Sequence, residues 1–179
     1  NYYGPPLSKV LNGQASNTSA REYLPQGKLG ISLDGIWITG NYLKTGASPW
    51  SEYSEVLGLA PMPTQHGDGA GIITLAGGWA WSIPAKSDDK DLTMEFIQHL
   101  MEPSVYVDAL VAMGSIGTRT DIADNEKYAS MPFIQTATEY LKAASFRPKD
   151  SKYPAVSTHI QTMVESVVSG TSPADAMAT

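Results

Sequence analysis

The chain has 179 residues, 42% of them apolar, which suits one domain with a sizeable core. Its net charge of −6 and its scattered basic residues argue against a nucleic-acid or anionic-membrane surface, which needs clustered lysine and arginine. The absence of cysteine excludes disulfides and thiolate chemistry, and the three histidines lack the spacing of metal ligands.

The first half of the chain has strand-like patterns separated by turns. Apolar and polar residues alternate over 27–35, which predicts a half-buried strand that ends in an Asp-Gly turn. A short helix or irregular turn is expected over 36–46. A second strand is expected over 54–63 and a third over 72–84, with an exposed glycine-rich loop at 64–71 between them.

The second half of the chain is predicted to be helical. Apolar residues recur with helical spacing in four stretches, and a proline just after a serine marks the start of a fifth helix. The predicted helices begin near Ser87 or Asp88, at Pro103, near Phe133, before Ile160 and at Ser172–Pro173. Three strands before five helices predict an α/β or α+β fold whose sheet is incomplete, because a lone strand pair is not stable.

Two of the four tryptophans follow a glycine pair in "AGGWAW". Trp79 and Trp81 are two residues apart, so on a strand they would share a face. Gly77 and Gly78 leave the backbone open to a close-approaching ligand. Burial in the core is one interpretation of each tryptophan. The other is a cleft wall where an indole packs on the C–H face of a sugar, as also suits Trp37 beside its Asp-Gly turn.

Other patterns have a plainer interpretation. The glycine-rich runs lack the GxGxxG spacing of a nucleotide site, and the aspartates at 88, 89 and 91 favour helix capping over a cation site. Glu52 and Glu55 beside Trp50 fit either a glycosidase pair or a solvated turn. No apolar run is long enough to span a membrane, and the first residues do not resemble a signal peptide, as expected of a mature form or a fragment.

Five segments, in order, resemble extracellular solute-binding proteins of bacterial ABC transporters, specifically the carbohydrate-binding group that includes maltose-binding proteins. "GKLGISLDGIW" is similar to the family's "GkxAMxxxGxW", and "VLGLAPMPT" to its "xxGxxPxP" strand. "GGWAWSIPAKSDDKDLTMEFIQHLMEPSVYVDAL" is similar to its strand-helix unit, "MGSIGTRTDI" to its "xGxxPxRxDv", and "SGTSPADAM" to the start of its last helix. Each match is weak alone, but the ordered set is fairly specific and runs from about residue 27.

The resemblance implies an α/β, periplasmic-binding-protein-like type II fold with two lobes. Residues 1–179 would be its C-terminal half, with incomplete sheets. About 27–50 and 120–179 would belong to the C-terminal lobe, and about 54–113 would return to the N-terminal lobe. The unpaired strand edges that this leaves could also support a dimer.

The resemblance also implies a set of ligand-binding residues: Trp37, Gly77, Gly78, Trp79, Trp81 and Arg119. Trp37 matches a sugar-stacking tryptophan, and Trp81 would face the ligand with Trp79 or pack behind it. Arg119 matches the arginine of the family's "PxR", but Gly117-Thr118 stands where proline is common, so a surface or helix-capping arginine is nearly as good an interpretation.

The function expected from the resemblance is non-catalytic, with no cofactor and no metal. The protein would bind a sugar or oligosaccharide between its lobes and deliver it to ABC transporter permease subunits. It would be extracellular, either periplasmic or a cell-surface lipoprotein. Its only link to the membrane would be an N-terminal lipid anchor that this chain has lost. The alternatives are a glycan-processing enzyme using Asp34 or Glu52, a binding protein for another solute, and an interaction domain with core tryptophans.

Overall fold

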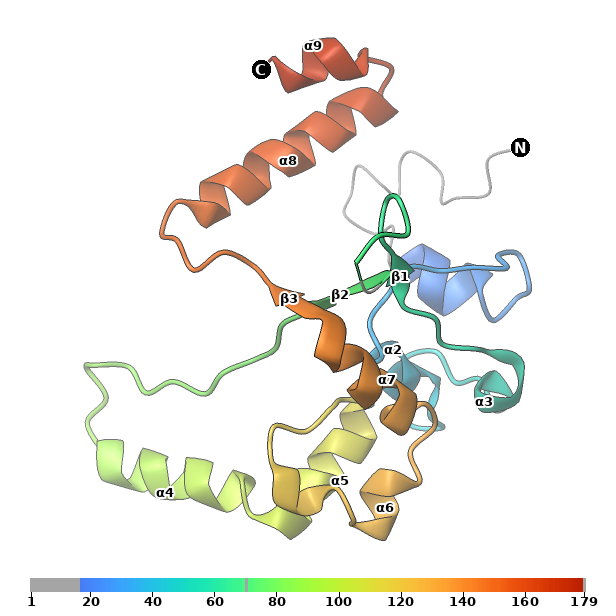
Figure 1. Cartoon of the computed structure of the whole chain (residues 1–179). Helices are drawn as coiled ribbons and strands as arrows, with labels where there is room; N and C mark the ends of the chain where they lie inside the picture. The colour runs from blue at the N-terminus through green and yellow to red at the C-terminus, as the bar shows by residue number, and fades with distance from the viewer. Residues whose placement is uncertain (1–16, 70, 179) are drawn as a thin grey trace. The chain divides into compact units, whose positions relative to one another are not determined.

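A computed structural model describes residues 17–69 and 71–178, and they form two compact units. The middle unit is Gly35–Phe146, and the terminal unit comprises the described residues 17–34 and 147–178. The terminal unit contains η1 (Asn17–Tyr23), α8 (Tyr153–Val168) and α9 (Pro173–Met177). The middle unit contains the remaining elements, among them α2 (Ile38–Tyr42), α3 (Tyr53–Val56), β1 (Met62–Pro63), β2 (Ile72–Ala76), α4 (Lys90–Leu100), α5 (Pro103–Met113), η2 (Thr120–Ile122), α6 (Glu126–Ala129), α7 (Ile134–Tyr140), η3 (Leu141–Ala143) and β3 (Ala144–Phe146) (Figure 1).

The sheet of the middle unit is small and incomplete, as predicted. Its three strands have the order β1-β2-β3, with β1 antiparallel and β3 parallel to β2. Thr74 is in register with Ala144, and Met62 with Ile73. The mixture of helices with a short, partly parallel sheet confirms the α/β class and its incomplete sheet.

Several predicted strand boundaries are wrong. Residues 27–35 form turn, bend and coil and belong to no strand, since no described segment pairs with them. The predicted strand at 54–63 contains α3 and only a two-residue strand, because Pro61 and Pro63 have no N–H to donate to a ladder. The strand expected over 72–84 stops at Ala76, directly before the glycine pair. Ala144, expected to end a helix, and the next two residues, expected to begin a loop, together form β3.

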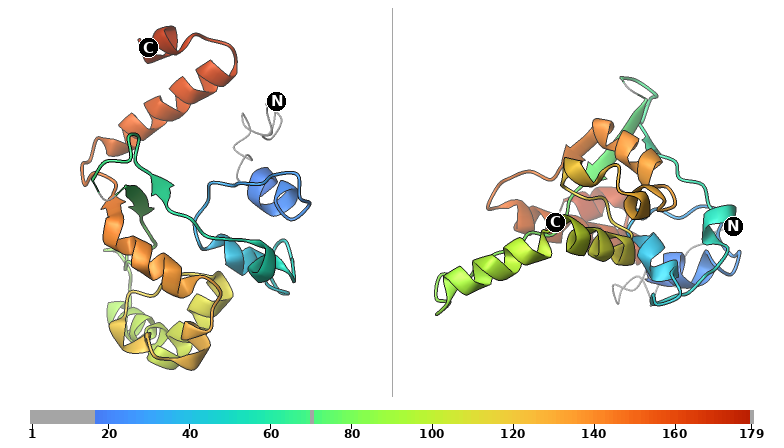
Figure 2. Two further views of the ribbon diagram at one scale, coloured as in Figure 1. Left: turned by 45° about the vertical axis from the view of Figure 1, so that its right-hand side comes forward. Right: turned by 90° about the horizontal axis from the view of Figure 1, so that it is seen from below.

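The helix predictions agree better with the structure. Pro103 is the first residue of α5, and Ser172 caps α9 by accepting the backbone N–H of Asp175. The cap of α4 is Asp89, and not Ser87 or Asp88, because its carboxylate accepts the N–H of Leu92 at 2.9 Å. α4 has no buried residue and extends as a single helix from the rest of the middle unit (Figure 2).

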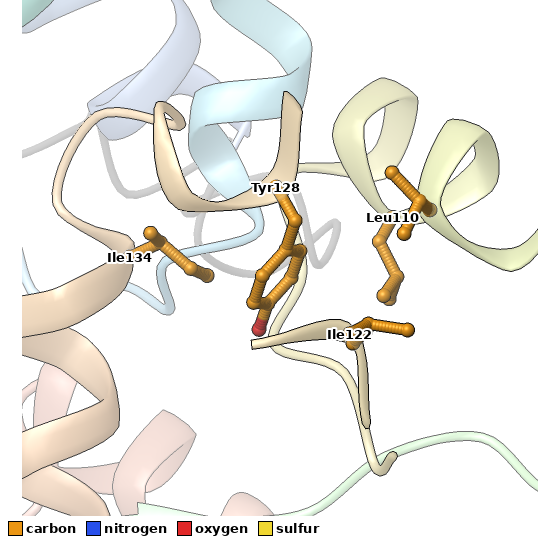
Figure 3. Packing of buried hydrophobic residues seen from close by; sticks show 5 residues of the cluster. Leu110, Ile122, Tyr128 and Ile134 are labelled. Atoms are coloured by element: carbon orange, nitrogen blue, oxygen red, sulfur yellow. The ribbon is translucent and has the colours of Figure 1, made fainter. Parts of the chain in front are cut away.

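The core of the middle unit is one cluster of five buried residues on α5, η2, α6 and α7. Its members are Val107, Leu110, Ile122, Tyr128 and Ile134. The ring of Tyr128 lies between Ile134 on one side and Leu110 and Ile122 on the other (Figure 3). This cluster anchors the loop between α5 and η2, which carries Arg119.

Two glycines set the contact between α2 and α5. Gly114 caps α5 with a φ of +64°, a left-handed conformation that favours glycine. A Cβ added at Gly114 would lie 2.5 Å from the nitrogen of Gly40, and one at Gly40 would lie 2.6 Å from the carbonyl carbon of Met113. Side chains at these two positions would therefore force the helices apart.

Candidate functional site

The segment after β2 exposes its two tryptophans. Trp79 is fully exposed, with a relative accessibility of 104%, and Trp81 is 66% exposed. Gly77 and Gly78 are exposed too, and nothing lies within 4 Å of a Cβ added at Gly78. Neither indole makes a hydrogen bond or ring contact with any described residue. Among the described residues neither Trp79 nor Trp81 is packed in a core, and both aromatic faces are open to solvent.

Trp37 is the residue that precedes α2, and its indole folds back over Gly35. A Cβ added at Gly35 would lie 2.5 Å from both Cδ1 and Nε1 of Trp37. The glycine of the Asp-Gly turn is therefore needed for packing too, since a side chain at Gly35 would collide with the indole of Trp37. The side chain of Trp37 is partly covered in this way but stays 43% exposed.

Two tyrosine hydroxyls hold the loop that follows α5. Tyr128 accepts the backbone N–H of Gly117 at 2.9 Å, and Tyr106 accepts that of Thr118 at 3.0 Å. The hydroxyls of Tyr106 and Thr118 also lie 3.0 Å apart. A Cβ at Gly117 would lie 2.6 Å from Ile122 Cδ1, so the loop lies directly on the core. The backbone leading to Arg119 is therefore fixed from two sides.

Arg119 is itself engaged by its neighbours. Its Nε donates to Asp121 Oδ1 at 2.9 Å and its Nη2 to Oδ2 at 2.5 Å, while Nη1 donates to the carbonyl of Met101 at 3.3 Å. The hydrogen bond between the two side chains raises the pKa of Arg119 and lowers that of Asp121. Since a guanidinium has five N–H groups, two remain for a ligand. Arg119 thus links the end of α4 to η2 and keeps donors in reserve.

A separate cavity of about 200 Å³ opens in the middle unit. Its lining residues come from α2, α3, α5 and the turn between α6 and α7: Thr39, Leu43, Tyr53, Val111, Gly114, Lys127, Ser130, Met131 and Pro132. None of the six predicted ligand-binding residues lines it. Trp37 comes nearest in sequence, two residues before Thr39.

Tyr53, which lines this cavity, belongs to a group of aromatic rings in contact. Tyr42 stacks edge-on against Trp50 at 5.4 Å between ring centroids and contacts Tyr53 at 5.6 Å. Tyr53 also lies 6.4 Å from Phe133. Burial raises the pKa of the Tyr53 phenol. Sequence reasoning passed over Tyr53, whose only signal was an aromatic residue after a Pro-Trp-containing turn.

The described residues contain no group of three or more metal-binding side chains placed to hold a metal ion. Across the same ranges, no helix has both the length and the apolar character that crossing a bilayer requires.

Comparison with protein families decides the class of protein. Residues 3–136 match the family model described as bacterial extracellular solute-binding protein. The chain belongs to this family. The match covers four of the five segments that suggested the resemblance, whereas "SGTSPADAM" lies beyond it.

Membership defines the coarse function of this solute-binding protein. It binds a solute outside the bacterial cytoplasm for an ABC transport system, and such proteins are in general not enzymes. The loop glycines, the exposed indoles and Arg119 all lie inside the matched region. The residues beyond 136, including α8 and α9, lie outside it.

Proposed function

We propose that this solute-binding protein captures a sugar or oligosaccharide and delivers it to the permease of an ABC transporter. The observation that carries the proposal is the pair of exposed indoles, Trp79 and Trp81, behind two glycines. Exposing an indole forgoes the stabilisation of burial, which a core tryptophan would keep. An apolar face that is open beside unencumbered backbone groups suits the alternating C–H and hydroxyl surfaces of a sugar ring.

Trp37 and Arg119 extend the proposed site. Trp37 is half-exposed and rigidly seated on Gly35, which limits the entropy lost when a ring stacks on it. The two spare N–H groups of Arg119 would donate to sugar hydroxyls. The two-lobed arrangement, with about 27–50 and 120–179 in one lobe and about 54–113 in the other, remains a prediction, as do the lipid anchor and a dimer through strand edges.

The deciding experiment is a titration of the protein with oligosaccharides, followed by tryptophan fluorescence and isothermal calorimetry. Trp79→Ala should weaken binding about fivefold, because an aromatic contact contributes about 1 kcal/mol. Trp50→Phe is the matched control, since Trp50 contacts Tyr42 and the phenyl ring preserves an aromatic contact there. Binding of amino acids or peptides in place of sugars would overturn the carbohydrate part of the proposal.

Delivery to the permease needs its own test. Uptake of the labelled sugar by the source bacterium should fall when the gene is deleted and recover with the wild-type gene. Unchanged uptake would contradict this part of the proposal. The enzyme alternative, which uses Asp34 or Glu52, gains no support from Glu52, whose side chain is exposed.

A further inference from the structure

The cavity of the middle unit has the size of a single-ring molecule. Its volume is about 200 Å³, and an apolar cavity of about 150 Å³ is known to hold one benzene ring. Leu43, Val111, Met131 and Pro132 supply an apolar lining. A pyranose would leave most of its hydroxyls without partners on these side chains, so the cavity is chemically distinct from the proposed sugar site.

Tyr53 gives the cavity an unused hydroxyl donor. Tyr53 is only 7% exposed, and its hydroxyl makes no hydrogen bond with any described residue. This phenolic O–H is therefore free to donate a hydrogen bond to an acceptor on a ligand. Because burial raises the pKa of Tyr53, the phenol keeps that proton at neutral pH. Tyr53 therefore favours a ligand with an acceptor.

Two further hydroxyls in the lining act as acceptors. Thr39 donates its proton to the carbonyl of Ile36 at 2.9 Å, and Ser130 donates its own to the carbonyl of Lys127 at 3.1 Å. Their protons are thus used, and their oxygen lone pairs remain. A ligand group that accepts from Tyr53 and donates to one of these oxygens satisfies both sides. A hydroxyl group does both.

The charge of the lining points to an uncharged ligand. Lys127 is the cationic residue among the lining side chains, and its ammonium already contacts Asp108 Oδ1 at 2.5 Å. Both side chains of this pair are more than half exposed, so water screens the remaining electric field of the two charges. A carboxylate entering the cavity would lose its hydration without gaining a free counter-charge.

We propose that this cavity is a second binding site, which takes a small uncharged molecule of one ring bearing a hydroxyl group, such as a phenol or a cyclic alcohol. Tyr53 donates to the ligand hydroxyl, Thr39 or Ser130 accepts from it, and the ring lies on Leu43, Val111 and Met131. The site is independent of the exposed tryptophans, none of which lines it.

Fluorine NMR with the full chain tests this site. The probe 4-fluorophenol should show saturable line broadening, while fluorobenzene, which lacks the hydroxyl, should bind about tenfold more weakly. Tyr53→Phe should weaken 4-fluorophenol binding by a similar factor and leave fluorobenzene unaffected. Tyr153→Phe, a change at a residue of α8 that does not line the cavity, is the matched control and should bind like the wild type.

Three results would overturn the proposal. The first is absence of 4-fluorophenol binding to a wild-type chain whose circular dichroism shows it to be folded. The second is equal binding of the two probes, or an unchanged affinity in Tyr53→Phe. The third is preferential binding of 4-fluorobenzoate that is lost in Lys127→Gln, which would make the site an anion site. Thr39→Val is a second test of the contacts made by the ligand hydroxyl. It should weaken the binding of 4-fluorophenol more than the binding of fluorobenzene.

Discussion

Tyr128→Phe tests how the loop carrying Arg119 is held. The Tyr128 ring is buried with Leu110 and Ile122, and its hydroxyl accepts the N–H of Gly117 at 2.9 Å. Phenylalanine keeps the ring and its packing, so the substitution opens no cavity in the core. What it removes is the only acceptor that the structure gives to a partly buried backbone N–H.

The expected loss of stability follows from that orphaned donor. A buried donor left without a partner costs about 1–3 kcal/mol, and since the Gly117 N–H is only partly buried we expect about 1–2 kcal/mol. Tyr106→Phe is the internal comparison, because it removes the acceptor of the exposed Thr118 N–H. Water can replace that acceptor, so the second substitution should cost about 0.5 kcal/mol.

Urea unfolding followed by circular dichroism measures the free energy of each variant, and amide hydrogen exchange locates the effect. Exchange at Gly117 should accelerate in Tyr128→Phe and stay close to wild type in Tyr106→Phe. A Tyr128→Phe variant within about 0.5 kcal/mol of wild type, the range of ordinary surface substitutions, would refute the reasoning. So would a Tyr106→Phe variant that is equally unstable.

Three further predictions concern other contacts. Gly114→Ala should lower the free energy of unfolding by more than about 2 kcal/mol, because the left-handed backbone of this residue and the close approach of α2 both oppose a Cβ atom. An unchanged midpoint of urea unfolding would contradict the close contact. Asp89→Ala should destabilise the first turn of α4 by about 0.5–2 kcal/mol, seen as faster amide exchange there, while exchange after Asp88→Ala should stay at the wild-type rate. Arg119 holds the pKa of Asp121 below its ordinary value of 3.8, so the stability from this pair is present above that pH and is lost as pH falls through the lowered pKa of the folded state. The difference in melting temperature between wild type and Asp121→Asn should therefore be largest near neutral pH and shrink in acid, and a difference that grows in acid would show the sign to be wrong.

Local signals predicted α4, α5, α7, α8 and α9, but they missed α3 and α6. A proline at the first position of α5 and a serine cap before α9 act within a few residues, so sequence alone can specify them. The cap of α4 was misplaced by one or two residues because three aspartates or serines in a row offer equivalent side chains. Only the backbone geometry selects Asp89, whose carboxylate reaches the N–H of Leu92.

Long-range contacts were harder to predict. β3 forms because Ala144–Phe146 pairs with β2, about 70 residues earlier in the chain. No local sequence pattern predicts this pairing. The hydrogen bonds from the loop after α5 to Tyr106 and Tyr128 have the same character. They join residues that only the folded core brings together.

The candidate site shows the same division between local and long-range information. The sequence posed a choice between core and surface for the tryptophans after the glycine pair, and the structure exposes Trp79 and Trp81. Arg119 was a candidate on resemblance alone, and its bonds to Asp121 and Met101 could not be foreseen. Tyr53 was missed because its unused hydroxyl becomes meaningful only once neighbouring helices enclose it.

The contact between Gly40 and Gly114 has a mechanical meaning. With backbone lying on backbone, no flexible side chain separates α2 from the end of α5 to absorb a displacement. Trp37 begins one side of this junction, and the loop to Arg119 begins on the other. We therefore expect a displacement of α2 to displace the end of α5 as well, and the reverse. A fluorescent probe placed in the loop would therefore report on the surroundings of Trp37, although the two segments are far apart in sequence.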